Sequence, residues 1–160
     1  MSETETTADA YRLRFATFAD AEVILAQRKA MFIDMGDRDE TALDAMGVQF
    51  IPWLERQFAA GTYCQWLVEH EGVAVGGAAV WTKDRLPGVR GPRMNVAYVL
   101  NVYVDPAHRR YGLARRMMEA ILAWSREQGF STVELHASDQ GRPLYASMGF
   151  AATNEMRFIL

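Results

Sequence analysis

The spacing of hydrophobic and polar residues divides the first part of the chain into a strand and a helix. Residues 11–15 alternate and predict a strand, and Thr17 followed by Asp20 is typical of a helix N-cap. A helix should follow, because apolar residues recur at helical spacing: Ala21, Ile24, Leu25, Met31 and Phe32. Arg28 falls on the same stripe and is its one charged member.

The next segment predicts a second helix that is interrupted. Residues 34–40 are a polar break, and residues 41–46 have the composition of a helix start. Gly47 and Pro52 then disfavour a continuous helix, so we expect a broken segment that ends at Gly61, with Pro52 in the first turn of its second half.

Three β-rich runs come next. Residues 63–69 and 73–82 flank His70-Glu71-Gly72, which predicts a hairpin, and Gly76-Gly77 indicates a bulge or a close approach to a ligand. Residues 84–95 predict a mobile loop whose basic residues are Arg85, Arg90 and Arg93. Residues 96–104 are mostly apolar, interrupted by Asn101, and predict a strand buried on both faces.

The last third predicts a helix, a strand, a short helix and a strand pair. Apolar residues recur at helical spacing from Leu113 to Trp124, and Gly129 marks the end of that helix. A strand over 132–137, a helix over 142–148 and strands over 150–152 and 155–160 follow. The order β-α-α-β-β-β-α-β-α-β-β predicts an α/β (α+β) fold with a sheet of about seven strands.

The turn before the third helix has the properties of an anion site. A chain passing from strand to helix leaves amide N–H groups without helical partners, and the helix dipole adds positive potential there. Gly112 allows close approach to an anion. Four arginines surround the turn: Arg109, Arg110, Arg115 and Arg116. An ordinary basic helix start explains this short pattern equally well, and neither a Walker sequence nor a three-glycine dinucleotide pattern is present.

Two ordered motifs carry a resemblance to a known family. Arg109-x-x-Gly112-x-Ala114, after Val102-Tyr103-Val104-Asp105-Pro106, resembles the acyl-CoA-binding motif of the GCN5-related N-acetyltransferases, the GNAT superfamily. The segment from Leu144-Tyr145 to Gly149-Phe150 is similar to the second signature of that family. The resemblance covers residues 11–160 and is strongest over 96–150. It implies a mixed central sheet whose fourth and fifth strands splay apart to admit the cofactor.

The resemblance also implies the cofactor and its ligands. Acetyl-CoA is expected, with CoA as product and no metal. The cofactor-binding residues that match the family are Val102, Tyr103, Val104, Arg109, Arg110, Tyr111, Gly112, Leu113, Ala114, Arg115 and Ser138. The backbone of Val102 and Val104 would bond the pantetheine. Ser138 stands where many relatives carry an asparagine, and a hydroxyl cannot supply both the donor and the acceptor of an amide. Asp139 beside it is a candidate cap of the short helix.

Tyr145 matches the tyrosine that serves as general acid toward the CoA sulfur in many family members; the alternative is an aromatic residue that only packs in the core. The base is unassigned, because residues 98–104 contain no glutamate. Glu134 and His136 share a strand face and are candidates, although a solvated glutamate and a half-buried histidine are the commoner roles.

Candidate acceptor-binding residues are Arg28, Asn101 and His136. A charge on an apolar stripe must pair, line a cavity or reach the surface, and Asn101 either orients the acceptor or satisfies local backbone groups. Several apolar residues are candidates for an acceptor wall or for simple core positions: Met31, Phe32, Met35, Phe50, Trp53 and Trp81. Cys64 has the expected role of a small buried hydrophobe.

Composition agrees with one catalytic domain over residues 11–160 behind a flexible tail over residues 1–10. The chain has 160 residues, half of them apolar, and a net charge of −3, which argues against general nucleic-acid binding. One cysteine and no apolar run of membrane-spanning length predict a cytoplasmic protein without a membrane partner. A homodimer is left open.

Together these observations predict an acetyl-CoA-dependent N-acetyltransferase that transfers the acetyl group directly to a primary amine of a small molecule, peptide or protein. The missing acidic cluster weakens the case for a polycationic acceptor. The alternative is a non-catalytic acyl-CoA-binding regulatory module of the same fold.

Overall fold

The computed structural model describes residues 10–89 and 94–160. Most of the expected N-terminal tail, residues 1–9, lies outside the described residues. The same holds for Arg90 and Arg93 of the expected basic loop.

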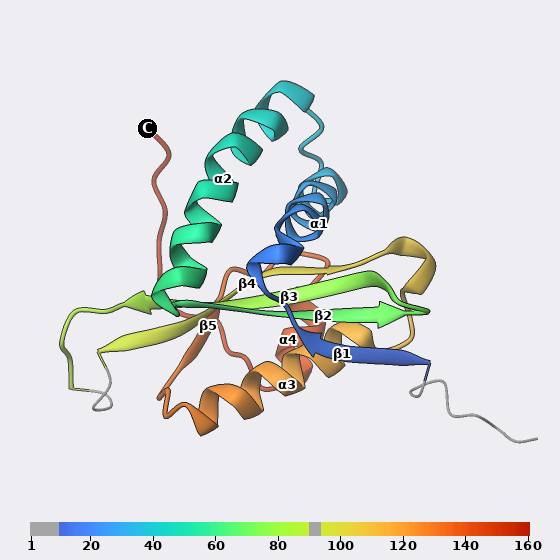
Figure 1. The fold of residues 1–160 in the computed structure, drawn as a ribbon. Helices are drawn as coiled ribbons and strands as arrows, with labels where there is room; N and C mark the ends of the chain where they lie inside the picture. Colours follow the sequence, from blue (N-terminus) through green and yellow to red (C-terminus); the bar gives the residue numbers. More distant parts are fainter. Residues whose placement is uncertain (1–9, 90–93) are drawn as a thin grey trace, which may run out of the picture.

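A mixed sheet forms the centre of the molecule (Figure 1). Its strands run in spatial order β1-β2-β3-β4-β5, with antiparallel pairing from β1 to β4 and parallel pairing between β4 and β5. Their bounds are Tyr11–Phe15, Tyr63–His70, Val73–Asp84, Asn95–Val104 and Val133–Leu135. The mixed α/β architecture is confirmed, but the described residues form five strands and not the expected seven.

Helices cover both faces of this sheet (Figure 1). On one face lie α1 (Ala21–Asp34) and α2 (Glu40–Ala60), and on the other lie α3 (Leu113–Glu127) and α4 (Arg142–Ser147). Two short 3-10 turns, Phe18–Asp20 and Pro106–His108, precede α1 and α3. The expected N-cap is confirmed, because the Thr17 N–H donates to the Asp20 carboxylate at 2.9 Å.

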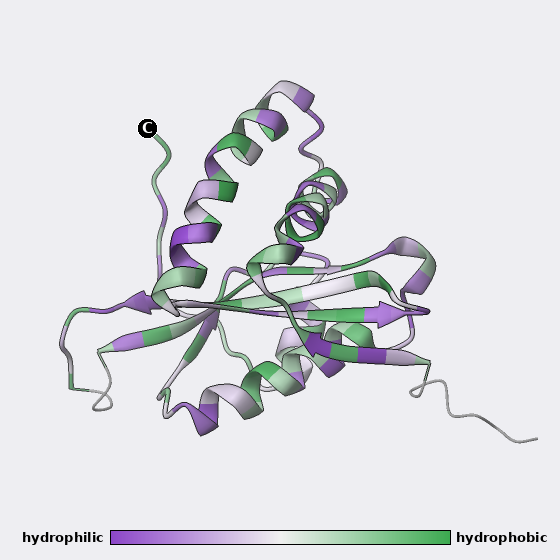
Figure 2. Cartoon of the chain, viewed as in Figure 1, coloured by the Kyte–Doolittle hydropathy of each residue, from purple (hydrophilic) through white to green (hydrophobic). Residues whose placement is uncertain are grey.

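The core has two parts, one on each side of the sheet. Ile24, Leu54 and Leu67 belong to the cluster under α1 and α2. Met117 and Ile121 of α3 pack with the strands on the opposite face. Hydrophobic and hydrophilic residues both occur along α3, as in an amphipathic helix (Figure 2). The helix ends as expected, because Gly129 adopts a left-handed conformation with φ 77°.

The expected break in the second helix is wrong, because α2 runs through Gly47 and Pro52 without interruption. Proline removes the N–H that would bond the carbonyl four residues earlier. That residue is Val48, which is 76% exposed and so lies on the solvent side of the helix. Gly47 is buried, and a Cβ there would lie 3.3 Å from the Leu25 side chain, so its small size lets α1 and α2 pack closely.

The expected C-terminal strand pair is also wrong, since residues 150–160 contain no strand. The apolar side chains of this segment are almost fully exposed: Met156, Phe158, Ile159 and Leu160. A strand is stabilised by a hydrogen-bonded neighbour and by burial of one face. No described strand pairs with this segment, and its extended course is visible beside α2 (Figure 1).

Strands β4 and β5 pair only briefly and then separate. Their register runs from Ala97 opposite Val133 to Val99 opposite Leu135. From Leu100 to Val104 the β5 side of β4 has no strand partner among the described residues. A bulge coincides with this separation: Asn101 has a φ of 56°, and the register with β3 shifts between Gly77 and Ala79. The expected splay is therefore present.

Candidate active site

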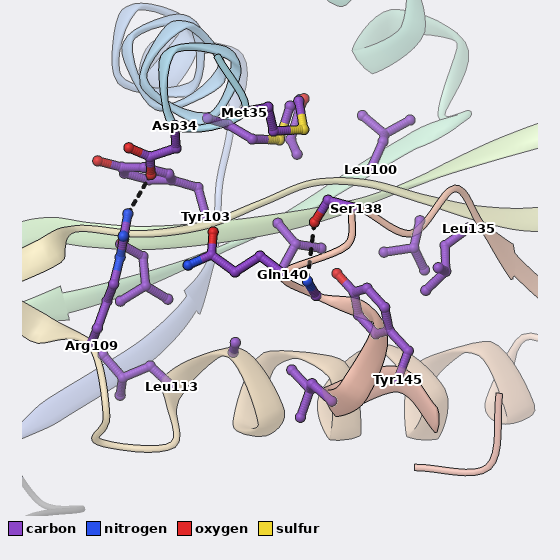
Figure 3. A pocket seen from close by; sticks show the side chains of 18 of the residues that line it. Asp34, Met35, Leu100, Tyr103, Arg109, Leu113, Leu135, Ser138, Gln140 and Tyr145 are labelled. Atoms are coloured by element: carbon purple, nitrogen blue, oxygen red, sulfur yellow. Dashed lines mark hydrogen bonds and ion pairs between the residues drawn. The ribbon is translucent and has the colours of Figure 1, made fainter. Parts of the chain in front are cut away.

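A cavity of about 800 Å³ occupies the region where β4 and β5 separate (Figure 3). Residues from the C-terminal half of α1 form one wall, and the unpaired part of β4 forms another. The turn before α3 lies at one end, and the segment from Leu135 to Tyr145 closes the remaining side. Both sequence motifs thus meet at one cavity.

The turn before α3 has the geometry of an anion cradle. Gly112 is left-handed, with φ 74°, and the Arg116 N–H bonds its carbonyl at 3.0 Å. The amides of residues 113–115 precede this bond and therefore have no helical carbonyl to bond. Gly112, Leu113, Ala114 and Arg115 all line the cavity, so these amides lie at its edge.

The arginines of the turn are held in different ways. The Arg109 Nε donates to the Val104 carbonyl at 2.9 Å, and its Nη2 forms an ion pair with Asp34 at the end of α1 (Figure 3). The Arg115 Nη2 donates to the Ser147 hydroxyl at 2.6 Å, while Arg110 is exposed at the cavity rim. The contact between Arg109 and Asp34 fixes the turn against α1.

Tyr111 lies away from the cavity, unlike the other residues of the turn that were expected to bind the cofactor. Its ring packs against Tyr11 with centroids 5.8 Å apart, and it is absent from the described residues that line the cavity. Val102, Tyr103 and Val104 do line the cavity, on the part of β4 that has no β5 partner. The backbone N–H and C=O groups along this edge can therefore form hydrogen bonds with an extended ligand, as they would with an added strand.

Tyr145 projects from α4 with its hydroxyl toward the cavity (Figure 3). The ring is held by Phe150, with centroids 5.9 Å apart, and by Gly141, where a Cβ would lie 2.9 Å from the ring. Burial raises the pKa of Tyr145, so the phenol keeps its proton in the neutral range. The hydroxyl has no hydrogen-bond partner among the described residues, which leaves it available to a ligand.

Ser138 lines the cavity, but its hydroxyl already accepts the Gly141 N–H at 3.1 Å. Ser138, and not the expected Asp139, therefore bonds the start of α4. The side chain of Gln140, two residues later, extends into the cavity between Tyr103 and Ser138 (Figure 3). Its amide offers the paired donor and acceptor that Ser138 lacks.

On the α1 side, Arg28 and Asn101 are in direct contact. The Arg28 Nη1 donates to the Asn101 Oδ1 at 2.5 Å, and both residues line the cavity. Asn101 is only 4% exposed, and its Nδ2 donates to the Tyr63 hydroxyl at 3.1 Å. Its side chain therefore orients other side chains and not the local backbone.

The two candidate bases differ in position. Glu134 forms an ion pair with Arg85 and is not among the described residues that line the cavity. His136 lines the cavity but is exposed, with its Nδ1 3.4 Å from the Arg157 Nη2. Of the two candidates, only His136 therefore lies at the cavity.

The expected apolar wall divides into two groups. Met31, Phe32 and Met35 line the cavity. Phe50, Trp53 and Trp81 instead pack with the cluster beneath α1 and α2. Cys64 is half-buried against the core, and burial raises the pKa of its thiol to about 11.

The site also contains residues that the sequence did not single out for it. Asp34, Tyr98 and Gln140 line the cavity, and Tyr63 holds Asn101 from below. Only Gln140 carried a usable signal, because it follows Ser138 within the same polar turn. The others depend on contacts between segments far apart in the chain.

The described residues contain neither a candidate metal site nor a candidate membrane-spanning helix. Within residues 10–89 and 94–160, no group of three or more His, Cys, Asp or Glu side chains could hold a metal ion. No helix in the same part of the chain is both long and apolar enough to cross a membrane.

The splayed sheet, the turn before α3 and the free edge of β4 meet at one cavity of an α/β protein. The chain belongs to the acetyltransferase (GNAT) family, whose model matches residues 28–150. The resemblance inferred from the two motifs is thereby confirmed.

Curated relatives match part of the chain. Human N-acetyltransferase 8 is 33% identical over 98 residues, which cover 59% of this chain and 41% of that protein. Glucosamine 6-phosphate N-acetyltransferase of Trypanosoma brucei brucei is 32% identical over 81 residues, or 51% of this chain and 53% of that protein. The chain therefore spans about half, or less, of the length of these relatives.

Solved structures match nearly the whole chain. A GCN5-related N-acetyltransferase from Ralstonia eutropha is 34% identical, with a TM-score of 0.87 and coverage of 94% of this chain and 98% of that one. A predicted acetyltransferase from Clostridium acetobutylicum, solved with acetyl-CoA, has the same TM-score at 23% identity, with coverage of 94% and 96%. The second similarity shows the fold, and it includes a family member in complex with the acyl donor.

Proposed function

We propose that this protein is an acetyl-CoA-dependent N-acetyltransferase that transfers the acetyl group directly to a primary amine. One observation carries the proposal: a single cavity joins the anion cradle, the free edge of β4 and the Tyr145 hydroxyl. The match to the GNAT family and the acetyl-CoA complex of a structural neighbour support it.

The cavity suits acetyl-CoA along its length. The amides of residues 113–115 and the arginines beside them would hold the pyrophosphate. The backbone of residues 102–104 would bond the pantetheine, because that edge has no β5 partner among the described residues. Gln140 would bond the same arm together with Ser138, whose oxygen accepts the Gly141 N–H while its O–H can still donate. The bound cofactor would supply the acetyl thioester.

The reaction needs a neutral amine and a proton for the leaving thiolate. An alkyl amine with a pKa of about 10.4 is neutral in roughly one molecule in a few thousand at pH 7, which costs about 4 to 5 kcal/mol. No described carboxylate lies free in the cavity to take that proton, since Asp34 is paired with Arg109. We infer that water in the open cavity removes it, and that Tyr145 donates its phenolic proton to the departing sulfur.

The alternative is a module that binds acyl-CoA without turnover. A half-buried phenol in the cavity, whose hydroxyl has no partner among the described residues, favours the enzyme, because mere binding does not require it. Release of free thiol from acetyl-CoA, measured across a panel of amines, amino acids and peptides, separates the two. Amine-dependent release supports the proposed function, whereas CoA binding with no release across the panel would support the regulatory module.

A further inference from the structure

Arg28 lies on the α1 wall of the cavity and has no carboxylate partner among the described residues. Within this part of the chain its guanidinium makes one hydrogen bond, to Asn101, and lies over the rings of Phe32 and Phe50 at 4.9 and 5.1 Å from their centroids. Its Nε is enclosed and has no hydrogen-bond partner among the same residues. An arginine stays charged under all ordinary conditions, so this site keeps a positive charge that is partly withdrawn from water.

Three other arginines of this chain are paired with carboxylates. Arg14 bonds both Asp20 and Glu69, Arg85 bonds Glu134, and Arg109 bonds Asp34. Arg28 has no such ion pair among the described residues. Asp34 is six residues further along α1, about 9 Å along the helix axis, and its carboxylate already serves Arg109.

The guanidinium is held in place by a directional network. The Asn101 oxygen accepts from Arg28 because its amide nitrogen donates to the Tyr63 hydroxyl. Tyr63 in turn donates to the Gln65 Oε1 at 2.6 Å, and the Gln65 amide donates to the Trp66 carbonyl at 3.0 Å. Every group in this buried chain has its donor and acceptor roles fixed, so Arg28 is oriented before any ligand binds.

We propose that the acceptor is a primary amine that also carries a carboxylate, and that Arg28 binds this carboxylate. This inference rests on the proposed function, because it assigns the second substrate of that reaction. The planar guanidinium matches a carboxylate, with paired N–H donors for its two oxygens. The bound carboxylate would supply the negative charge that Arg28 lacks among the described residues.

The position of Arg28 fits an amine close to its carboxylate. Asn101, which holds Arg28, directly precedes Val102 on β4, where the free edge of the strand begins. A carboxylate on Arg28 would therefore lie beside the segment that would bind the thioester end of the cofactor. An amine one carbon away from the carboxylate, as in an α-amino acid, is then within reach of the acetyl group.

The surrounding side chains narrow the acceptor further. Met31, Met35 and Leu100 line the same cavity as Arg28 and favour an apolar substituent. A single guanidinium balances one carboxylate, whereas a phosphate dianion needs more positive charge. An amine with several positive charges would meet Arg28 as a like charge. The acceptor class is therefore an amino acid, or an amino-acid derivative, with an apolar side chain.

The test compares acceptors that differ only in the carboxylate. L-Phenylalanine and L-methionine are each compared with their carboxamides, with O-phosphoethanolamine as a phosphate-bearing amine, in the thiol-release assay with the full chain. We expect kcat/KM to favour the free acids about 10- to 100-fold. The amides have the more acidic amines, which favours them chemically, so a preference for the acids must come from binding.

Variants assign the preference to Arg28. Arg28→Met should reduce the acid-to-amide ratio to within about twofold while the KM for acetyl-CoA stays the same, and Arg28→Lys should keep part of the ratio. Arg85→Met removes an arginine that is paired outside the cavity and should leave the ratio unchanged. Thermal unfolding checks that each variant is folded.

A binding measurement decides the matter if Arg28→Met does not fold or if turnover is slow. Calorimetric titration of the wild-type chain and Arg28→Lys with CoA, and then with N-acetyl-L-phenylalanine or its amide, should show tighter binding of the acid to the wild type. Turnover of acids and amides alike, equal binding of the two products, or preference for the phosphate would overturn the carboxylate assignment while leaving the proposed function intact. Thiol release by no amine would instead count against the proposed function.

Discussion

At the scale of single residues, the cavity depends on side chains whose roles follow from burial. Tyr145 is the clearest case, because burial raises the pKa of its phenol and no described residue uses its hydroxyl. A phenol in this state is a proton donor at neutral pH and not a base. This state fits the role that we propose for Tyr145, protonation of the leaving sulfur.

Replacing this hydroxyl should slow turnover without loosening the cofactor. Tyr145→Phe keeps the ring between Phe150 and Gly141, so we expect kcat to fall about 100-fold while acetyl-CoA affinity changes little. Tyr11→Phe, which removes a phenol outside the cavity, is the control. Steady-state rates with a true acceptor measure the effect, and an unchanged kcat would show that Tyr145 is not the general acid.

Gly77 shows how closely β3 approaches the α1 side of the core. A Cβ there would overlap the Gln27 Oε1 and lie 2.7 Å from the Gln65 Nε2. Gly77→Ala should therefore lower the free energy of unfolding by about 2 to 3 kcal/mol, measured by urea denaturation. Gly88→Ala is the control, because the nearest atom to its added Cβ is 3.9 Å away. Equal midpoints for the two variants would contradict the packing described here.

At the scale of elements, the proposed cofactor binding depends most on the turn into α3. Gly112→Glu adds a side chain in a left-handed conformation and a negative charge beside the expected pyrophosphate. Acetyl-CoA affinity should fall at least about 100-fold by calorimetry. Gly112→Asn tolerates the left-handed conformation without adding charge and should retain most of the affinity. Wild-type affinity in the glutamate variant would place the pyrophosphate elsewhere.

The start of α1 is stabilised by Asp20 in a pH-dependent way. The hydrogen bond from Arg14 lowers the pKa of Asp20, and the Thr17 N–H acts in the same direction. Because the folded pKa lies below the unfolded one, the stabilisation is complete above the ordinary carboxyl value of about 4 and is lost as pH falls through the lower folded value.

Asp20→Asn should therefore destabilise the protein by about 1 kcal/mol at pH 7, and its difference from wild type should narrow as pH falls below about 4. Urea midpoints at a series of pH values measure this. Asp44→Asn, whose carboxylate is 76% exposed beside Lys29, should have little effect at any pH. A difference in stability between Asp20→Asn and wild type that stays the same at every pH would contradict the pH-dependent stabilisation by Asp20.

Local signals explain which elements the sequence could predict. Gly112, Gly129 and the Thr17–Asp20 pair act within one or two turns, so their positions follow from the chain itself. Pro52 led to a wrong prediction, because the free-energy cost of its missing hydrogen bond depends on whether Val48 faces solvent. Only the packing of the helix decides that. The C-terminal segment misled for the same reason: its apolar residues suit a strand, but no described neighbour pairs with it.

At the scale of the whole molecule, the site forms where distant segments meet. The part of the cavity that we propose for the cofactor could be located from the sequence, because most of its motif residues lie within one stretch, from Val102 to Arg115. The part that we propose for the acceptor could not, because it joins Arg28, Asn101 and Tyr63 across 73 and 38 residues of sequence. Gln140 also lines the cavity, and its proposed contact with the pantetheine could not be predicted from the motif, which points to Ser138.

A crystal structure of the chain with CoA would test the proposed site most directly. We expect the pyrophosphate against the amides of residues 113–115, the pantetheine along residues 102–104, and the sulfur at about 3 to 3.5 Å from the Tyr145 hydroxyl. CoA bound outside this cavity, or a sulfur more than about 6 Å from that hydroxyl, would contradict it.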